Sequence, residues 1–165
     1  MSHSIFRRSA AATLATLVLS LSGPVLSAQP QPQAQGPVGL WFDHTGRGAV
    51  EISPCGNDLC GRIVWLKDLN DKNGRPLRDA LNGETGKRNR PICGLQVIGG
   101  LKQQSDGSWD KGWIYDPEQG ESFDVELRLR GADGLQVKGY KGLKFLSETF
   151  QWKRVAALPS ARCGK

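Results

Sequence analysis

The chain has 165 residues and a mass of 18.0 kDa, which matches one compact domain with short tails and excludes a multidomain enzyme. Hydrophobic residues make up 38% and charged residues 23%, a balance too apolar for a disordered chain. The formal net charge is +6, but the basic residues are interspersed with acidic and apolar ones, which argues against a nucleic-acid-binding protein.

Residues 1–28 have the pattern of a secretory signal peptide. An arginine pair precedes an apolar run at 11–26, and the small residues Ser27 and Ala28 follow it. A retained membrane anchor is the weaker alternative, because Gly and Pro break the run before it reaches the roughly 20 apolar residues that span a bilayer. We therefore expect cleavage near Ala28 and a periplasmic or secreted protein with no stable membrane insertion after cleavage.

A polar, proline-broken segment at 29–37 follows and is predicted to be a disordered tether. The expected domain covers 38–156, and 157–165 form a C-terminal tail. Removal of residues 1–28 takes away two arginines and no acid, so the charge falls from +6 to +4.

From residue 38 onward, apolar and polar residues alternate in short runs between turn residues, which is typical of half-buried strands. The clearest run places Phe123, Val125 and Leu127 on one face and charged residues between them. Eight strands are predicted, at 38–42, 48–54, 60–66, 92–101, 108–116, 123–130, from 135 onward, and at 147–155.

Eight antiparallel strands joined by tight turns lose their exposed edges most simply by closing into an up-and-down barrel. The predicted fold is therefore all-β, an eight-stranded antiparallel barrel. A two-sheet sandwich is the alternative, but it needs long crossover connections, and the sequence has one long loop, 67–91, between strands three and four. This loop is either a lid over one barrel end or a flexible excursion, and 75–82 could form one or two helical turns with Leu77 and Leu81 facing the barrel.

The mature part holds four cysteines, an even number in a chain expected to be exported, which indicates disulfides. Spacing alone permits three pairings. Cys55 and Cys60 flank a turn-forming tetrapeptide and could join the neck of a hairpin, which leaves Cys93 for Cys163. A zinc site is the competing interpretation, although no Cys-x-x-Cys pair exists and no histidine lies near a cysteine.

Candidate catalytic and metal-binding residues are few, and we predict no catalytic residue, metal or cofactor. His44 is the single histidine after residue 28, and its nearest acid, Asp43, is adjacent in sequence and would point to the opposite face of a strand. Residues 68–74 resemble a calcium loop but lack two ligand positions. A hydrolase using Asp116 or His44 remains a minority hypothesis.

Two sets of motifs resemble known families. Gly39-Leu40-Trp41 with Arg154 resembles the signature of the calycin barrels, including lipocalins, in which the Trp plugs the barrel base beneath a basic side chain. A longer series resembles the bacterial envelope family called domain of unknown function 2147. Its residues are Pro54-Cys55, Leu59-Cys60-Gly61, Arg88-Asn89-Arg90-Pro91, Gly94, Gly112, Ile114-Tyr115-Asp116-Pro117, Gly120, Val137-Lys138-Gly139-Tyr140, Gly142 and Trp152-Lys153-Arg154. The resemblance implies a lipocalin-like barrel in an exported protein and transfers no activity, and Cys93 departs from it because an aliphatic residue is common there.

The barrel interior is the remaining candidate site. The residues expected to point inward are Trp65, Phe123, Val125, Leu127, Phe150 and Trp152. We predict a non-enzymatic binding module for a small apolar or anionic ligand, with these candidate binding residues: Trp65, Arg88, Arg90, Tyr115, Phe123, Tyr140, Phe150 and Trp152. In this hypothesis Arg88 and Arg90 hold an anionic head group at the rim; alternatively, they close the barrel end through carbonyls and carboxylates. A protein-interaction or envelope-structural module with a fully packed barrel is the alternative function, and its protein partner is unknown.

Overall fold

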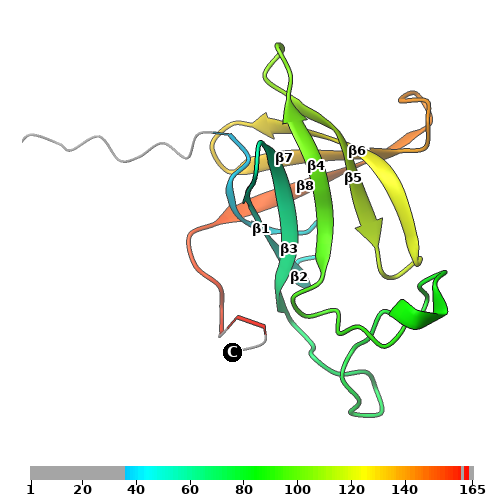
Figure 1. The fold of residues 1–165 in the computed structure, drawn as a ribbon. Helices are drawn as coiled ribbons and strands as arrows, with labels where there is room; N and C mark the ends of the chain where they lie inside the picture. Colours follow the sequence, from blue (N-terminus) through cyan, green and yellow to red (C-terminus); the bar gives the residue numbers. More distant parts are fainter. Residues whose placement is uncertain (1–35, 161, 164–165) are drawn as a thin grey trace, which may run out of the picture. The chain divides into compact units, whose positions relative to one another are not determined.

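The computed structural model describes residues 36–160, 162 and 163. The predicted signal segment 1–28 and most of the tether lie outside the described residues. The described chain forms eight strands and one short 3-10 helix (Figure 1). Their bounds are β1 Gly39–Phe42, β2 Gly48–Cys55, β3 Asp58–Leu66, η1 Thr85–Lys87, β4 Gln96–Gln103, β5 Trp109–Asp116, β6 Glu121–Arg130, β7 Gly134–Tyr140 and β8 Ser147–Val155.

The strands form a closed antiparallel barrel in which each strand pairs with its neighbours in sequence. Closure comes from β1, which pairs with β2 on one side and with β8 on the other, so that Trp41 lies opposite both Val50 and Arg154. This pairing confirms the predicted up-and-down barrel and excludes the two-sheet sandwich. The long loop between β3 and β4 is present as predicted.

The apolar side chains that alternate along each strand pack inside the barrel. Val125 and Leu127 on β6 pair with Gly139 and Val137 on β7, and both are fully buried in the main hydrophobic cluster. Glu126, which lies between them, points to the outer face, where Lys144 and Arg128 cover its carboxylate. This cluster joins side chains from all eight strands, so burial of one apolar face per strand holds the barrel closed.

Trp65 was predicted to point into the barrel, but it points outward. The β2–β3 register shifts between Ala49 and Val50, so that Ala49 pairs with Trp65 while Val50 pairs with Ile63. The extra residue of this β-bulge reverses the alternation, because one inserted residue moves the following side chain to the other face. Trp65 therefore packs outside the main core, in a second cluster with Ala49 and Leu158, and its indole donates a hydrogen bond to Ser160 Oγ at 2.9 Å.

Two further predictions are wrong: the start of β4 and the helical turn at 75–82. β4 begins at Gln96 and not at Ile92, because the chain turns at 92–95, where Gly94 has a positive φ of 83°. The helical turn expected at 75–82 is absent, and the short helix of the loop lies at Thr85–Lys87. Leu77 packs against the core as expected, but Leu81 is exposed.

The end of the barrel near residue 36 is closed by Trp41 and Arg154. The Arg154 guanidinium lies 4.0 Å from the centroid of the Trp41 ring and donates hydrogen bonds to the carbonyls of Gly36, Val38 and Ala132. The Trp41 indole is fully buried and donates to the Pro37 carbonyl at 2.7 Å. Gly39 has a φ of 132°, and a Cβ there would lie 2.7 Å from Arg154 Nη1, so this close approach requires glycine.

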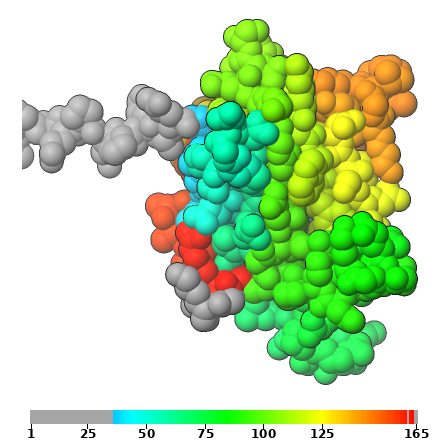
Figure 2. Space-filling model, viewed as in Figure 1, coloured from blue at the N-terminus to red at the C-terminus, as the bar shows by residue number. Residues whose placement is uncertain are grey.

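Two disulfides, Cys55–Cys60 and Cys93–Cys163, use all four cysteines and leave none to bind zinc. The first joins the ends of β2 and β3. The second fixes the C-terminal segment beside β3, where the Cys163 N–H also donates to the Val64 carbonyl (Figure 2). Among the described residues, no helix is long and apolar enough to cross a membrane.

Candidate ligand cavity in the barrel

A cavity of about 880 Å³ lies in the barrel, and we call it the lumen. Its walls are apolar inside the barrel and polar at the end opposite Trp41 and Arg154. The apolar lining residues are Ala49, Val50, Ile63, Leu66, Leu77, Ile92, Val97, Ile114, Phe123, Val137, Phe145, Leu146, Phe150 and Trp152. A cavity of this size falls within the range of small-molecule pockets.

The open end, which we call the mouth, is formed by the β1–β2 turn, the β3–β4 loop, the β5–β6 turn and the β7–β8 loop. The charged residues that line the lumen cavity are Asp43, Asp68, Asp116, Glu118 and Glu148, with Arg47, Arg78 and Lys141. Two of these three cations already pair with carboxylates, Arg47 with Asp68 and Lys141 with Glu121. Carboxylates therefore exceed cations at the mouth, which disfavours a negatively charged ligand group there.

His44 lies at the mouth, exposed, and stacks on Phe150 with ring centroids 4.3 Å apart. The Asp43 carboxylate accepts hydrogen bonds from the backbone and the hydroxyl of Thr45. Asp116 similarly accepts from the Glu118 N–H and the Gln119 side chain. Within the described part of the chain, no hydrogen bond joins His44 to a carboxylate, so the arrangement of a nucleophile, histidine and acid is not present there.

The β3–β4 loop is anchored to the barrel by Asp79, a fully buried carboxylate. Asp79 accepts hydrogen bonds from the Tyr115 hydroxyl at 2.5 Å, from Arg90 Nη2 at 2.6 Å and from Asn82 Nδ2 at 2.9 Å. Asn82 Nδ2 also donates to the Tyr115 oxygen. The loop thus forms one side of the mouth in a defined position, and Leu77 and Arg78 line the lumen beside this anchor.

The same network shifts two ionisation equilibria. Burial raises the pKa of Asp79, but the hydrogen bonds from Tyr115, Arg90 and Asn82 outweigh it, so the pKa lies below its ordinary value. Burial, together with the hydrogen bond to Asp79, raises the pKa of Tyr115. The anchor therefore consists of a charged carboxylate and a neutral phenol at neutral pH.

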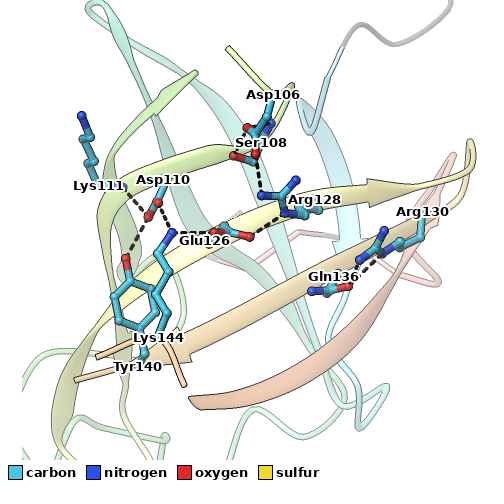
Figure 3. A network of polar contacts seen from close by, with 10 residues as sticks. All are labelled: Asp106, Ser108, Asp110, Lys111, Glu126, Arg128, Arg130, Gln136, Tyr140 and Lys144. Carbon is cyan, nitrogen blue, oxygen red and sulfur yellow. Dashed lines mark hydrogen bonds and ion pairs between the residues drawn. The ribbon is translucent and has the colours of Figure 1, made fainter. Parts of the chain in front are cut away.

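A second polar network on the outer wall holds the β7–β8 loop (Figure 3). Lys144 Nζ bridges the carboxylates of Asp110 on β5 and Glu126 on β6. The Tyr140 hydroxyl donates to Asp110, and Arg128 donates to Glu126 at 2.6 Å. Because Phe145 and Leu146 follow Lys144 and line the lumen, this bridge places apolar side chains at the mouth.

Five of the eight predicted ligand-binding residues line the lumen. Phe123, Phe150 and Trp152 contribute rings to its wall. Tyr115 and Tyr140 also line it, but their hydroxyls are hydrogen-bonded to Asp79 and Asp110. The contact surface that these five residues offer to a ligand is therefore mainly aromatic.

The other three predicted residues do not line the lumen. Trp65 lies outside the barrel wall, as described above. Arg88 Nε donates to the Asn82 carbonyl, and Arg90 pairs with Asp79, so both stabilise the loop through a carbonyl and a carboxylate. The anionic head group predicted from these two arginines has no support at the mouth.

Sequence reasoning missed the β1–β2 turn and the β7–β8 loop as parts of the site. Arg47, Lys141 and Phe145 belong to these segments. The signal was available, because in an up-and-down barrel alternate hairpin turns meet at the same end, and the β3–β4 loop marks that end.

The closed barrel with an aromatic-lined lumen defines a lipocalin-like protein class. Residues 39–154 match the family described as "Uncharacterized protein conserved in bacteria (DUF2147)", and the chain belongs to this family. Among solved structures, it is similar to protein HP1028 from the human pathogen Helicobacter pylori, described as belonging to the lipocalin family. That match has a TM-score of 0.62 and 20% identity and covers 72% of this chain and 82% of the other, which supports the fold. No curated protein is similar enough to this chain to count as a match.

Proposed function

We propose that this protein is an exported binding protein that holds one small apolar ligand in the lumen. The observation that carries the proposal is the cavity of about 880 Å³, which has an apolar, aromatic wall and a mouth at one end. A fully packed barrel, the alternative of an interaction module, would not contain such a cavity. Two disulfides and the signal-like segment 1–28 support export.

The proposed ligand has no negative charge. The mouth carries more carboxylates than cations, and neither Arg88 nor Arg90 lines the lumen. An alcohol, amine or other uncharged or positive polar end therefore fits the mouth better than a carboxylate or phosphate. The apolar part of the ligand would contact Phe123, Phe150 and Trp152.

The test is displacement of the neutral fluorescent probe N-phenyl-1-naphthylamine by three ligands with the same chain: 1-decanol, decylamine and decanoate. We expect saturable probe binding and displacement by decanol and decylamine at concentrations at least about fivefold lower than by decanoate at pH 7. Absence of saturable probe binding would contradict lumen binding. Strongest displacement by decanoate would contradict the charge assignment of the mouth.

A further inference from the structure

A second cavity lies on the outer wall of the barrel, separate from the lumen, and we call it the groove. It measures about 450 Å³, and its side-chain walls include Arg62, Arg90, Leu95, Gln96 and Trp113. None of its lining residues lines the lumen. The groove lies where β3, β4 and β5 adjoin the β3–β4 loop, and this loop projects from the barrel in Figure 1.

Trp113 presents its ring to this groove because of the strand on which it lies. Gly112 and Ile114 face inward, so Trp113 faces outward, and it pairs with Gly99 on β4. A Cβ at Gly99 would lie 2.6 Å from the indole, so the absence of a side chain there lets the ring lie against the β4 backbone. Trp113 nevertheless remains 40% exposed, which leaves part of its ring open for stacking.

Two arginines bring positive charge to the groove. Arg62 is exposed, donates Nη1 to the Gly94 carbonyl at 2.8 Å, and forms no ion pair with any carboxylate that the structure describes. Arg90 pairs with Asp79 through Nη2, but its Nε is buried and has no hydrogen-bond partner in the described protein. The Arg90 side chain as a whole is 38% exposed, so part of its guanidinium is open to a ligand in the groove.

Among the residues that the structure describes, no carboxylate lines the groove. Two acids lie next to the groove along the sheet: Glu51, opposite Arg62 on β2, which accepts from Arg162, and Asp124, opposite Trp113 on β6, which accepts the Gly142 N–H. The groove therefore differs in charge from the mouth, where carboxylates predominate. Guanidinium groups recognise carboxylate and phosphate oxygens, and an indole face stacks on flat apolar groups.

We propose that the groove binds a small organic anion, with its carboxylate or phosphate held by Arg62 and Arg90 and its flat apolar part stacked on Trp113. This site is independent of the lumen and of any ligand there. It combines an anion-binding and a stacking element, so a ligand that carries both groups binds more tightly than a ligand with either alone.

The test follows the five tryptophan indole N–H resonances of ¹⁵N-labelled protein during titration. The probes are 1-naphthyl phosphate and 1-naphthoate, with inorganic phosphate and 1-naphthol as half-ligands. Trp113→Phe assigns the Trp113 resonance by its loss. We expect the Trp113 resonance to shift saturably with at least one naphthyl anion, at least about tenfold more tightly than with phosphate or naphthol. Whether the phosphate or the carboxylate binds more tightly identifies the preferred head group.

The matched variants are Arg62→Gln and Arg130→Gln. Arg62→Gln keeps a donor for the Gly94 carbonyl, so the loop stays in place, but it removes the positive charge and should weaken binding about tenfold. Arg130→Gln removes an exposed arginine on β6 outside the groove and should leave binding unchanged. The proposal is overturned if both variants bind alike, if naphthol binds as tightly as the anions, or if Trp152 shifts in place of Trp113.

Discussion

Tyr115 on β5 donates its hydroxyl hydrogen to Asp79 on the β3–β4 loop, joining two residues 36 positions apart at a fully buried carboxylate. We predict that Asp79→Ala lowers the free energy of unfolding by about 3 kcal/mol, because it leaves Arg90 and Tyr115 without their shared acceptor. Tyr115→Phe should cost about 1 kcal/mol. Asp68→Ala in the same loop is the control, since its exposed ion pair with Arg47 contributes at most about 1 kcal/mol. Urea unfolding measures all three, and equal effects of Asp79→Ala and Asp68→Ala would show that the loop is not anchored at Asp79.

The acid dependence of stability follows from the lowered pKa values of buried carboxylates. For Asp79, Asp110 and Glu126, burial raises the pKa, but hydrogen bonds and neighbouring cations outweigh it and lower the folded-state pKa below the unfolded value. The stability they contribute is therefore fully present above the unfolded pKa of about 4 and is lost as pH falls through the folded pKa. Urea midpoints between pH 2 and pH 6 should fall toward the acid end, with a shallower fall in Asp79→Asn. A flat profile would contradict the ionised networks.

Stability should also fall at alkaline pH, because Tyr140 ionises less readily in the folded state than in the unfolded state. Burial, followed by the hydrogen bond to Asp110, raises the pKa of Tyr140 to about 12. Its contribution is fully present below the unfolded pKa of about 10 and is lost as pH rises through about 12. Tyr140→Phe should remove this part of the alkaline loss, as measured by urea midpoints between about pH 9 and pH 12. An unchanged slope in the variant would show that Tyr140 ionises as readily in the folded state as in the unfolded one.

Lys144 is predicted to hold the β7–β8 loop at the mouth (Figure 3). Lys144→Met removes the bridge between Asp110 and Glu126 and leaves two neighbouring carboxylates. We expect faster hydrogen exchange at 141–147 and weaker binding of the neutral probe, because Phe145 and Leu146 line the lumen. Lys138→Met, on β7, is the control. Unchanged exchange in Lys144→Met would mean that the backbone alone positions the loop.

The two disulfides should differ in their effect on stability. The Cys93–Cys163 bridge has a sequence separation of 70, against 5 for Cys55–Cys60. The entropy of loop closure therefore predicts losses of about 4 and about 2 kcal/mol when each is replaced by a serine pair. Loss of the longer bridge should also free the C-terminal segment, with a change in Trp65 fluorescence as its bond to Ser160 breaks. A larger loss from the shorter bridge would contradict this account.

The barrel was predictable from the sequence because burial of one strand face enforces a period of two, as in Phe123, Val125 and Leu127. Trp65 could not be placed that way, because the β-bulge at Ala49 and Val50 adds one residue and the C-terminal segment covers the ring. The start of β4 was also misplaced, because the chain makes a turn at 92–95 and the strand begins only at Gln96.

The candidate site was less predictable than the fold. Phe123, Phe150 and Trp152 follow from strand alternation, and they line the lumen. Arg90 pairs with Asp79, 11 residues away, and Arg88 donates to the Asn82 carbonyl, 6 residues away, and these partners lie in an irregular loop that has no sequence pattern. We predicted both arginines at the mouth from their position in the loop. In the structure, Arg90 pairs with Asp79 and lines the groove.

The most direct test of the lumen as the binding site compares two tryptophan substitutions on β7. Val137 is buried and lines the lumen, whereas the neighbouring Lys138 points outward. We expect Lys138→Trp to bind one N-phenyl-1-naphthylamine per chain with wild-type affinity, and Val137→Trp, checked for folding by circular dichroism, to bind none because the indole fills the lumen. Unchanged affinity in folded Val137→Trp would show that the probe binds elsewhere and would contradict the proposed function.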